Sequence, residues 1–232
     1  MSLPLFLVDE IPTGDRWTLA GSEGHHAANV QRLTAGEALL LGDGRGSLLR
    51  AVVVAARKGE LDLSLDAASH VPSPDPTITV VQGIAKGERG ELAVQLLTEV
   101  GADRIVPWQA ARSVARWKDA KPLERWRATV REAVKQSRRA WLPEVTAAQT
   151  TRQLSFPGPV LVLHEEASTP LSAVPLPSTG SITLVVGPEG GVAPEELAAL
   201  NGTPVRLGPE VLRTSTAGAA AVAALSVRLG RW

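Results

Sequence analysis

The 232-residue chain contains no cysteine and only four histidines, which are scattered along the sequence. It therefore has no disulfide framework, no thiolate chemistry and no cluster of metal ligands. No apolar run is long enough to span a bilayer, and the N-terminus MSLPLFLVDE lacks the basic start of a signal peptide. The net charge is zero, which argues against a protein that coats nucleic acid uniformly. We expect a cytoplasmic protein that needs neither a metal nor a membrane.

Several common catalytic motifs are also missing. The loop Gly83–Gly90 (GIAKGERG) carries glycines and a lysine but no closing Gly-Lys-Ser/Thr, so it is not a Walker A phosphate loop. No GxGxxG follows the first strand of the C-terminal half, which disfavours a standard dinucleotide-binding Rossmann domain. The absence of a GxSxG elbow and of a carboxylate pair leaves a hydrolase without support.

The most informative stretch that is present is ITLVVGPEGG, at Ile182–Gly191. Its first five residues form a short, mostly β-branched apolar run, which is typical of a strand buried on both faces. Three glycines in the next five positions allow positive φ and close approach, so that bare N–H and C=O groups can face a ligand. Pro194 and the acids after it mark a helix start. A strand, a glycine loop and a helix build ligand sites in α/β sheets, although a tight turn without a ligand has the same pattern.

Two further strands of the C-terminal half end in loops that are able to bind a ligand. Val160–Leu163 runs into His164-Glu165-Glu166, and Val205–Leu207 runs into Gly208–Arg213. His164 is a candidate general base, but a single histidine at a strand end is more often a structural hydrogen-bonding residue. Strands and helices alternate from Thr77 onwards, which predicts an α/β domain.

The N-terminal part has a different pattern. Short strands are predicted at Leu3–Val8, Ala38–Leu41, Leu48–Ala56 and Leu61–Leu65, with one helix at Glu23–Leu33, and this combination suggests a small barrel. The sequence VPSPDP at 71–76 has three prolines in six residues and reads as a stiff linker. We therefore place one domain at 1–71 and a second at 77–232.

Polar and cationic residues gather on two predicted helices. His25, Asn29 and Arg32 recur at i, i+4 and i+7, a spacing that gives one polar face, whose ordinary interpretation is a solvated surface. Between residues 112 and 139 there are ten Lys/Arg and three acids, a net charge of +7. The helix predicted at Lys121–Arg139 has apolar residues on one stripe and six cations on the opposite half, which favours phosphate contact over a solvated face. Trp117 and Trp126 are expected to point in opposite directions.

Two motifs near the C-terminus carry a family resemblance. VVGPEGG (185–191) with LGPEVLRTSTA (207–217) resembles the SPOUT methyltransferases of the RsmE type, which methylate N3 of a uridine in small-subunit ribosomal RNA with S-adenosylmethionine. HHAANVQRL (25–33), KGERGELAVQLLTEVGADRIVPW (86–108) and REAVKQSRRAWLPEV (131–145) resemble further blocks of that family in the same order. The resemblance implies a PUA-like β-barrel followed by an α/β SPOUT domain, with a trefoil knot at about 160–232 that holds the cofactor, and a homodimer.

The same resemblance implies a set of site residues. The cofactor is expected against Leu163, His164, Gly187, Pro188, Glu189, Gly190, Leu207, Gly208, Val211, Leu212, Arg213 and Ser215. Ser215 stands where many members carry glutamate, which weakens the case for a catalytic acid there. The RNA is expected to contact His25, Asn29, Arg32, Lys86, Arg89, Arg131 and Lys135.

Uridine N3 is a good nucleophile only once it has lost its proton. A nearby cation lowers the pKa of that N–H and stabilises the anion, and the candidates for this role are Arg138, Arg139 and Arg213. Glu189 either accepts the proton or only hydrogen-bonds the cofactor. Two alternatives stay open: a non-catalytic RNA-binding protein with a degenerate knot, and a SPOUT methyltransferase acting on a different RNA position. The substrate is either naked RNA or the assembled small subunit.

Overall fold

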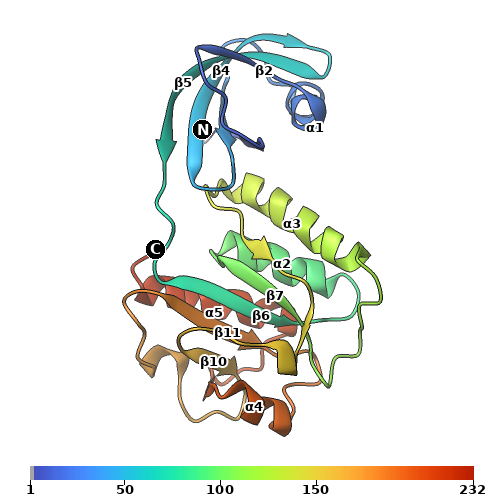
Figure 1. Cartoon of the computed structure of the whole chain (residues 1–232), viewed down its shortest axis with the longest axis vertical. Coiled ribbons are helices and arrows are strands. Elements are labelled where there is room, and N and C mark those ends of the chain that lie inside the picture. Colours follow the sequence, from blue (N-terminus) through green and yellow to red (C-terminus); the bar gives the residue numbers. More distant parts are fainter. Residues whose placement is uncertain (1–2) are drawn as a thin grey trace. The chain divides into compact units, whose positions relative to one another are not determined.

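Figure 1 shows the computed structural model of the protein, which describes residues 3–232. The chain forms two compact units. The first comprises the chain up to Ser73 together with Val134–Leu142, and the second comprises Pro74–Ala133 and Pro143–Trp232. The boundary between the units at Ser73 lies inside the proline-rich linker. The sequence predicts that the segment Val134–Leu142 belongs to the second domain, but it groups with the first unit.

A five-stranded sheet forms the first unit. In the spatial order β1-β3-β4-β5-β2, β1 runs parallel to β3 and every other pair is antiparallel. Alternating side chains from the strands, with Phe6 among them, fill a single apolar core. The strands are β1 (Leu5–Leu7), β2 (Arg16–Leu19), β3 (Ala38–Gly42), β4 (Ser47–Arg57) and β5 (Glu60–His70). Strand β2 is missing from the strands predicted from the sequence, although RWTL alternates polar and apolar residues, because four residues are a weak signal.

The helix predicted at Glu23–Leu33 is shorter than expected and changes type. It consists of α1 (Gly21–His25) and a π-helical turn, η1 (His26–Val30). Arg32 lies beyond both and has φ 56°, a left-handed conformation that does not continue a right-handed helix. The predicted polar face therefore loses its third member.

The turn between β3 and β4 is built around the Asp43 carboxylate. Its Oδ1 accepts the backbone N–H groups of Arg45 and Ser47 at 2.7 and 3.0 Å. Burial tends to raise the pKa of Asp43, but these hydrogen bonds outweigh it and leave the pKa below its usual range. The charged carboxylate thus holds the turn at neutral pH.

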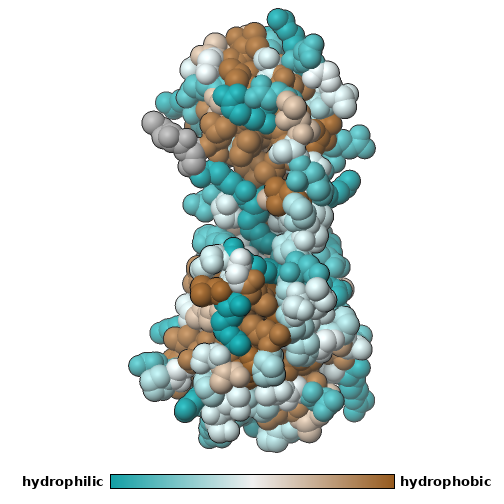
Figure 2. Space-filling model, turned by 90° about the vertical axis from the view of Figure 1, so that its left-hand side faces the viewer, coloured by the Kyte–Doolittle hydropathy of each residue, from teal (hydrophilic) through white to brown (hydrophobic). Residues whose placement is uncertain are grey.

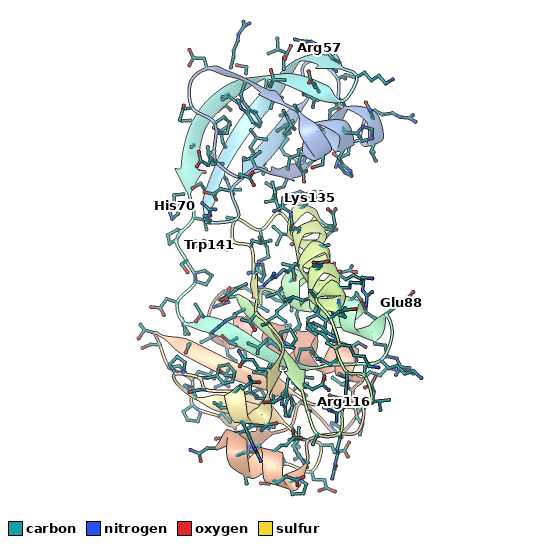
Figure 3. The ribbon with its side chains drawn as sticks, turned by 45° about the vertical axis from the view of Figure 1, so that its right-hand side comes forward. Arg57, His70, Glu88, Arg116, Lys135 and Trp141 are labelled. Carbon is teal, nitrogen blue, oxygen red and sulfur yellow. The ribbon has the colours of Figure 1, made fainter. Side chains whose placement is uncertain are left out.

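The segment Val134–Leu142 is tied to the first unit by backbone and ring contacts. The Leu142 N–H donates to the carbonyl oxygen of Gly44 at 2.9 Å, and Trp141 Nε1 donates to that of Val71 at 2.9 Å. The Trp141 ring also meets His70 edge to face, and Figure 3 labels both side chains. These contacts explain why a segment distant in the sequence belongs to this unit.

The second unit contains a parallel sheet in the order β12-β10-β11-β6-β7-β8, with β9 paired to the end of β7. The five residues Ile182–Val186 are all buried, as their β-branched character predicts. The last strand ends at Val205 rather than Leu207, because Arg206 makes only an isolated bridge. The strands are β6 (Thr77–Gly83), β7 (Arg104–Gln109), β8 (Glu144–Val145), β9 (Gln149–Thr150), β10 (Val160–Leu163), β11 (Ser181–Val186) and β12 (Thr203–Val205).

Helices cover this sheet in the arrangement that Figure 1 shows. Helix α5 packs against α2, β6 and β11. Residues of α4 join Leu154 and Phe156 over an apolar cluster that the sheet supplies. The helices are α2 (Arg89–Glu99), α3 (Lys121–Ser137), α4 (Pro194–Leu200) and α5 (Thr214–Arg228), with 3-10 turns η2 (Thr151–Gln153) and η3 (Leu171–Ala173).

Two expectations for α3 are wrong in detail. The helix ends at Ser137, because Arg138 has φ 55°, so Arg138 and Arg139 lie just past the helix rather than on it. The rings of Trp117 and Trp126 meet edge to face with centroids 4.9 Å apart instead of pointing apart, since Trp117 precedes the helix and folds back on it.

Within residues 3–232, no helix is long and apolar enough to cross a membrane. The same residues include no group of three or more His, Asp or Glu side chains placed to hold a metal ion.

Candidate ligand pocket at the carboxyl ends of the strands

A pocket of about 630 Å³ lies in the second unit, where β10, β11 and β12 end. These strands are parallel neighbours, so the loops that follow them emerge at the same edge of the sheet. The three loops predicted from the sequence, His164–Glu166, Gly187–Gly191 and Gly208–Arg213, all line it. Its volume is typical of sites for small molecules and cofactors.

The glycine loop after β11 packs so closely on its neighbours that side chains are excluded. A Cβ atom on Gly83, at the end of β6, would lie 2.5 Å from the backbone nitrogen of Pro188. A Cβ on Gly190 would lie 2.9 Å from the Cβ of Arg112 and 3.0 Å from its carbonyl oxygen. The shortest distance at each position, 2.5 and 2.9 Å, is below any normal Cβ contact, so the loop keeps its position only with glycine at these two places.

A short chain of polar contacts joins the glycine loop to α5 and β6. The Thr214 hydroxyl donates to the carbonyl oxygen of Gly187 at 3.1 Å. Gln82, which is 1% exposed, donates from Nε2 to the carbonyl oxygens of Gly83 at 3.2 Å and Thr214 at 3.4 Å. The end of β6, the start of α5 and the glycine loop are thereby linked beneath the pocket.

Glu189 in the glycine loop faces the β6–α2 connection. Its Oε1 accepts the backbone N–H of Lys86 at 3.4 Å and lies 3.7 Å from Nη1 of Arg89. Because the Arg89 side chain is half exposed, this ion pair contributes little to the free energy of unfolding. The pair instead holds the Glu189 carboxylate in place at the rim of the pocket.

A buried carboxylate lies behind the pocket. Glu196 is 5% exposed, and its Oε1 accepts hydrogen bonds from the Ala111 N–H at 2.9 Å and the Thr151 hydroxyl at 2.6 Å. Its Oε2 accepts the N–H of Ala193 at 3.3 Å, which caps the start of α4. The Thr151 oxygen in turn accepts Nε1–H of Trp108 at 3.1 Å. Glu196 thus ties α4 to η2 and to the loop after β7.

The pocket contains eleven of the twelve residues predicted for the cofactor. The exception is Ser215, which is buried on another side of α5, whereas Thr214 and Ala217 from the same helix line the pocket. Val211 and Leu212 are exposed apolar residues at its edge, as expected of a surface that meets a ligand. Sequence reasoning missed Arg112, whose Nη1 donates to the carbonyl oxygen of Gly190 at 3.2 Å.

The three predicted catalytic arginines belong to different units. Arg213 lines the pocket, whereas Arg138 and Arg139 belong to the segment that groups with the first unit. A catalytic role for these two residues stays a prediction.

The residues predicted to contact RNA also divide between the units. His25, Asn29, Arg32 and Lys135 belong to the first, and Lys86, Arg89 and Arg131 belong to the second. Asn29 Nδ2 lies 3.0 Å from His25 Nδ1, and Asn29 Oδ1 accepts the N–H of Gly59, so Asn29 is partly used to hold the β4–β5 turn. The Lys135 side chain is only 11% exposed and lies 3.4 Å from Glu23, which makes it a poor candidate for binding phosphate.

Comparisons with known proteins agree with this architecture. A family model described as an RNA methyltransferase domain matches residues 72–226, and one described as an RNA methyltransferase PUA domain matches residues 19–66. The chain is 49% identical to the ribosomal RNA small subunit methyltransferase E of Mycobacterium tuberculosis, over 98% of this chain and 93% of that protein. It is 32% identical to the protein of the same name from Bacillus subtilis, over 94% and 91% of the two chains.

Solved structures show the same fold. A ribosomal RNA small subunit methyltransferase E from Neisseria gonorrhoeae, bound to S-adenosylmethionine, is 28% identical and superposes with a TM-score of 0.88 over 98% of both chains. A putative methyltransferase from Legionella pneumophila, in complex with the same cofactor, is 27% identical, with a TM-score of 0.85 over 98% of both chains. The predicted fold class, a PUA-like domain followed by an α/β methyltransferase domain, is confirmed.

We predict that Glu196→Gln destabilises the second unit by about 1–3 kcal/mol, because an amide NH₂ in the place of Oε2 would face the Ala193 N–H donor and leave it without an acceptor. Urea unfolding followed by tryptophan fluorescence measures this change. The control is Glu195→Gln, since Glu195 is the exposed neighbour on the same helix and its replacement should change the free energy by less than about 0.5 kcal/mol. Equal effects of the two substitutions would show that the buried network contributes nothing.

Proposed function

The chain belongs to the RNA methyltransferase family, and on this premise we propose that it transfers a methyl group from S-adenosylmethionine to N3 of a uridine in small-subunit ribosomal RNA. The observation that carries the proposal is the pocket at the ends of β10, β11 and β12, which the two family-like motifs GPEGG and LGPEVLR line together. The ribosomal target rests on the resemblance and on the names of the relatives, the uridine N3 atom rests on the resemblance, and a cytoplasmic location rests on the composition of the sequence.

The residues that line the pocket fit this cofactor. The close packing of Gly83 and Gly190 leaves backbone groups of the glycine loop without shielding side chains, which suits hydrogen bonds to an adenosine. Val186, Val192 and Val205 offer an apolar wall for a base, and acidic and basic side chains together suit a zwitterionic amino-acid tail. The cofactor, when bound, supplies a methyl group on a positively charged sulfur.

The protein's part in such a reaction is to position the two reactants and to stabilise charge. Arg213 is the predicted catalytic cation that lines the pocket, where it would stabilise negative charge on the uridine ring as N3 loses its proton. Glu189 is held at the rim by Arg89 and the Lys86 N–H, so we assign it to orienting ligand groups. Arg138 and Arg139 remain candidates for the same electrostatic role as Arg213.

We further propose that residues 160–232 form a trefoil knot and that the protein is a homodimer. The second unit exposes the large apolar residue Val227 in the last turn of α5 and Trp232 after it. Figure 2 shows hydrophobic residues on the visible face of that unit. On the side of α5 that is not buried within the chain, the small residues Ala220, Ala223 and Ala224 allow close approach of another backbone. Both features favour a partner surface along this helix.

The central prediction is that the protein transfers labelled methyl groups from S-adenosylmethionine to small ribosomal subunits that lack the modification. Naked small-subunit RNA serves as the parallel substrate, and mass spectrometry of the digested RNA identifies the product as N3-methyluridine. Label on another base would support an RNA methyltransferase but overturn uridine N3 as its target. If the protein transfers no label and calorimetry detects no cofactor binding, the non-catalytic RNA-binding protein is the remaining alternative.

Gly83→Ala should weaken S-adenosylmethionine binding at least tenfold, because the new Cβ meets backbone atoms of the glycine loop that have to move. Calorimetry measures the dissociation constant without requiring turnover. Gly42→Ala is the control outside the pocket, since its Cβ would meet mainly the ends of the Leu5 and Leu48 side chains at 3.1 Å. Unchanged binding by Gly83→Ala would mean that the position of the glycine loop does not determine affinity.

Sedimentation velocity should give a mass near twice the 24.4 kDa of one chain. Val227→Asp, which places a charge at a 62% exposed position of α5, should shift the equilibrium toward the monomer. Val54→Asp, at an exposed position of β4, is the control and should leave the mass unchanged. A monomeric wild-type protein at micromolar concentration would refute the dimer.

A further inference from the structure

The connection between β7 and α3, residues 110–120, lies against the glycine loop and carries three exposed cations. We call it the rim loop, and its cations are Arg112, Arg116 and Lys118. We propose that the rim loop binds backbone phosphates of the RNA at the edge of the pocket. The proposal rests on the proposed function, to which it adds a surface that holds the substrate.

The rim loop is held in one conformation by a side chain at its base. Gln109 Nε2 donates to the carbonyl oxygen of Ala115 at 3.0 Å, and Gln109 Oε1 accepts the N–H of Trp117 at 3.4 Å. The N–H of Ser113 closes a turn on the carbonyl oxygen of Ala110 at 3.1 Å. A loop folded on its own hydrogen bonds loses little conformational entropy when it binds.

Two contacts with other elements fix where this loop stands. The buried Glu196 carboxylate accepts the Ala111 N–H, and the Trp117 ring packs on Trp126 of α3. Through Arg112, whose Nη1 donates to the carbonyl oxygen of Gly190, the loop also contacts the glycine loop directly. The position of the three cations is therefore tied to the position of the pocket.

The cations of the rim loop lack acidic partners. Among the ion pairs of the described residues none involves Arg112, Arg116 or Lys118, and all three residues are exposed. Figure 3 labels Arg116 on this loop. The acid in the loop, Asp119, is used at the start of α3, where its Oδ1 accepts the N–H of Lys121 at 3.0 Å.

Two arginines of the basic face of α3 are engaged within the protein. Arg125 pairs with Glu91 at 3.1 Å, and both Nε and Nη2 of Arg127 donate to the carbonyl oxygen of Val145. A guanidinium already committed within the protein has fewer donors left for a phosphate. The loop before the helix is the part of the +7 window that combines three exposed cations outside any ion pair of the described residues with direct contact to the glycine loop, and fixed cations beside a reaction pocket position a nucleic acid backbone.

The test is the salt dependence of RNA binding. The affinity of the full-length protein for an unmodified small-subunit ribosomal RNA transcript is measured over a series of KCl concentrations, with S-adenosylhomocysteine present. Each phosphate contact to single-stranded RNA contributes about 0.7 to the slope of log affinity against log salt, so replacing all three cations by methionine should reduce the slope by about 2. Arg112→Met, Arg116→Met and Lys118→Met alone should each remove about one third of that change.

Arg152→Met is the matched control, because Arg152 is an exposed cation of the same unit that does not line the pocket. It should leave the slope unchanged, and neither it nor Arg116→Met nor Lys118→Met, which all lie outside the pocket lining, should change the cofactor dissociation constant more than twofold. An unchanged slope in the triple variant would overturn the proposal. Weaker cofactor binding by Arg112→Met at an unchanged slope would also overturn it, by assigning Arg112 to the cofactor.

The proposed function has a separate test. If the wild-type protein makes a product other than N3-methyluridine, the proposed function is overturned, but the slope measurement still tests the rim loop. A wild-type protein that binds cofactor but neither the transcript nor small ribosomal subunits would overturn both.

Discussion

The close contact of bare backbone around the glycine loop is the constraint on which the pocket depends. Gly83 presses against Pro188, and Gly190 presses against Arg112, at distances that no side chain tolerates. Backbone groups of the loop are therefore held at fixed places at the pocket, and the free energy for fixing them comes from folding rather than from binding. The ends of β10 and β12 complete the pocket because β10 pairs with β11 and β12 pairs with β10 in the same parallel sheet.

Support for this pocket comes from polar side chains at its base and behind it. Gln82 and Thr214 hold the glycine loop from below, and Glu196 holds the rim loop from behind. Buried polar groups are costly unless each finds a partner, and Glu196 accepts three hydrogen bonds from three different segments. Such groups convert the approximate placement that a parallel sheet provides into the ångström-level placement that methyl transfer requires.

The distribution of charge shows which properties of the site are visible in the sequence and which are visible only in the structure. The +7 window is visible in the sequence, and so is the one-sided helix within it. Which of its cations are available for RNA is not visible, because Glu91 and Glu23, which engage Arg125 and Lys135, lie 34 and 112 residues away. Local spacing identifies a helical face, but it carries no information about partners brought together by folding.

The sequence by itself determined the strand of Ile182–Val186, the glycine loop after it and the family, because β-branched runs and glycines act on the nearest backbone. It did not determine the segment Val134–Leu142, the early end of α3 at Arg138, or the burial of Ser215. Those features depend on contacts between residues far apart in the chain. Only the tertiary structure decided them, since such contacts compete with local preference and override it.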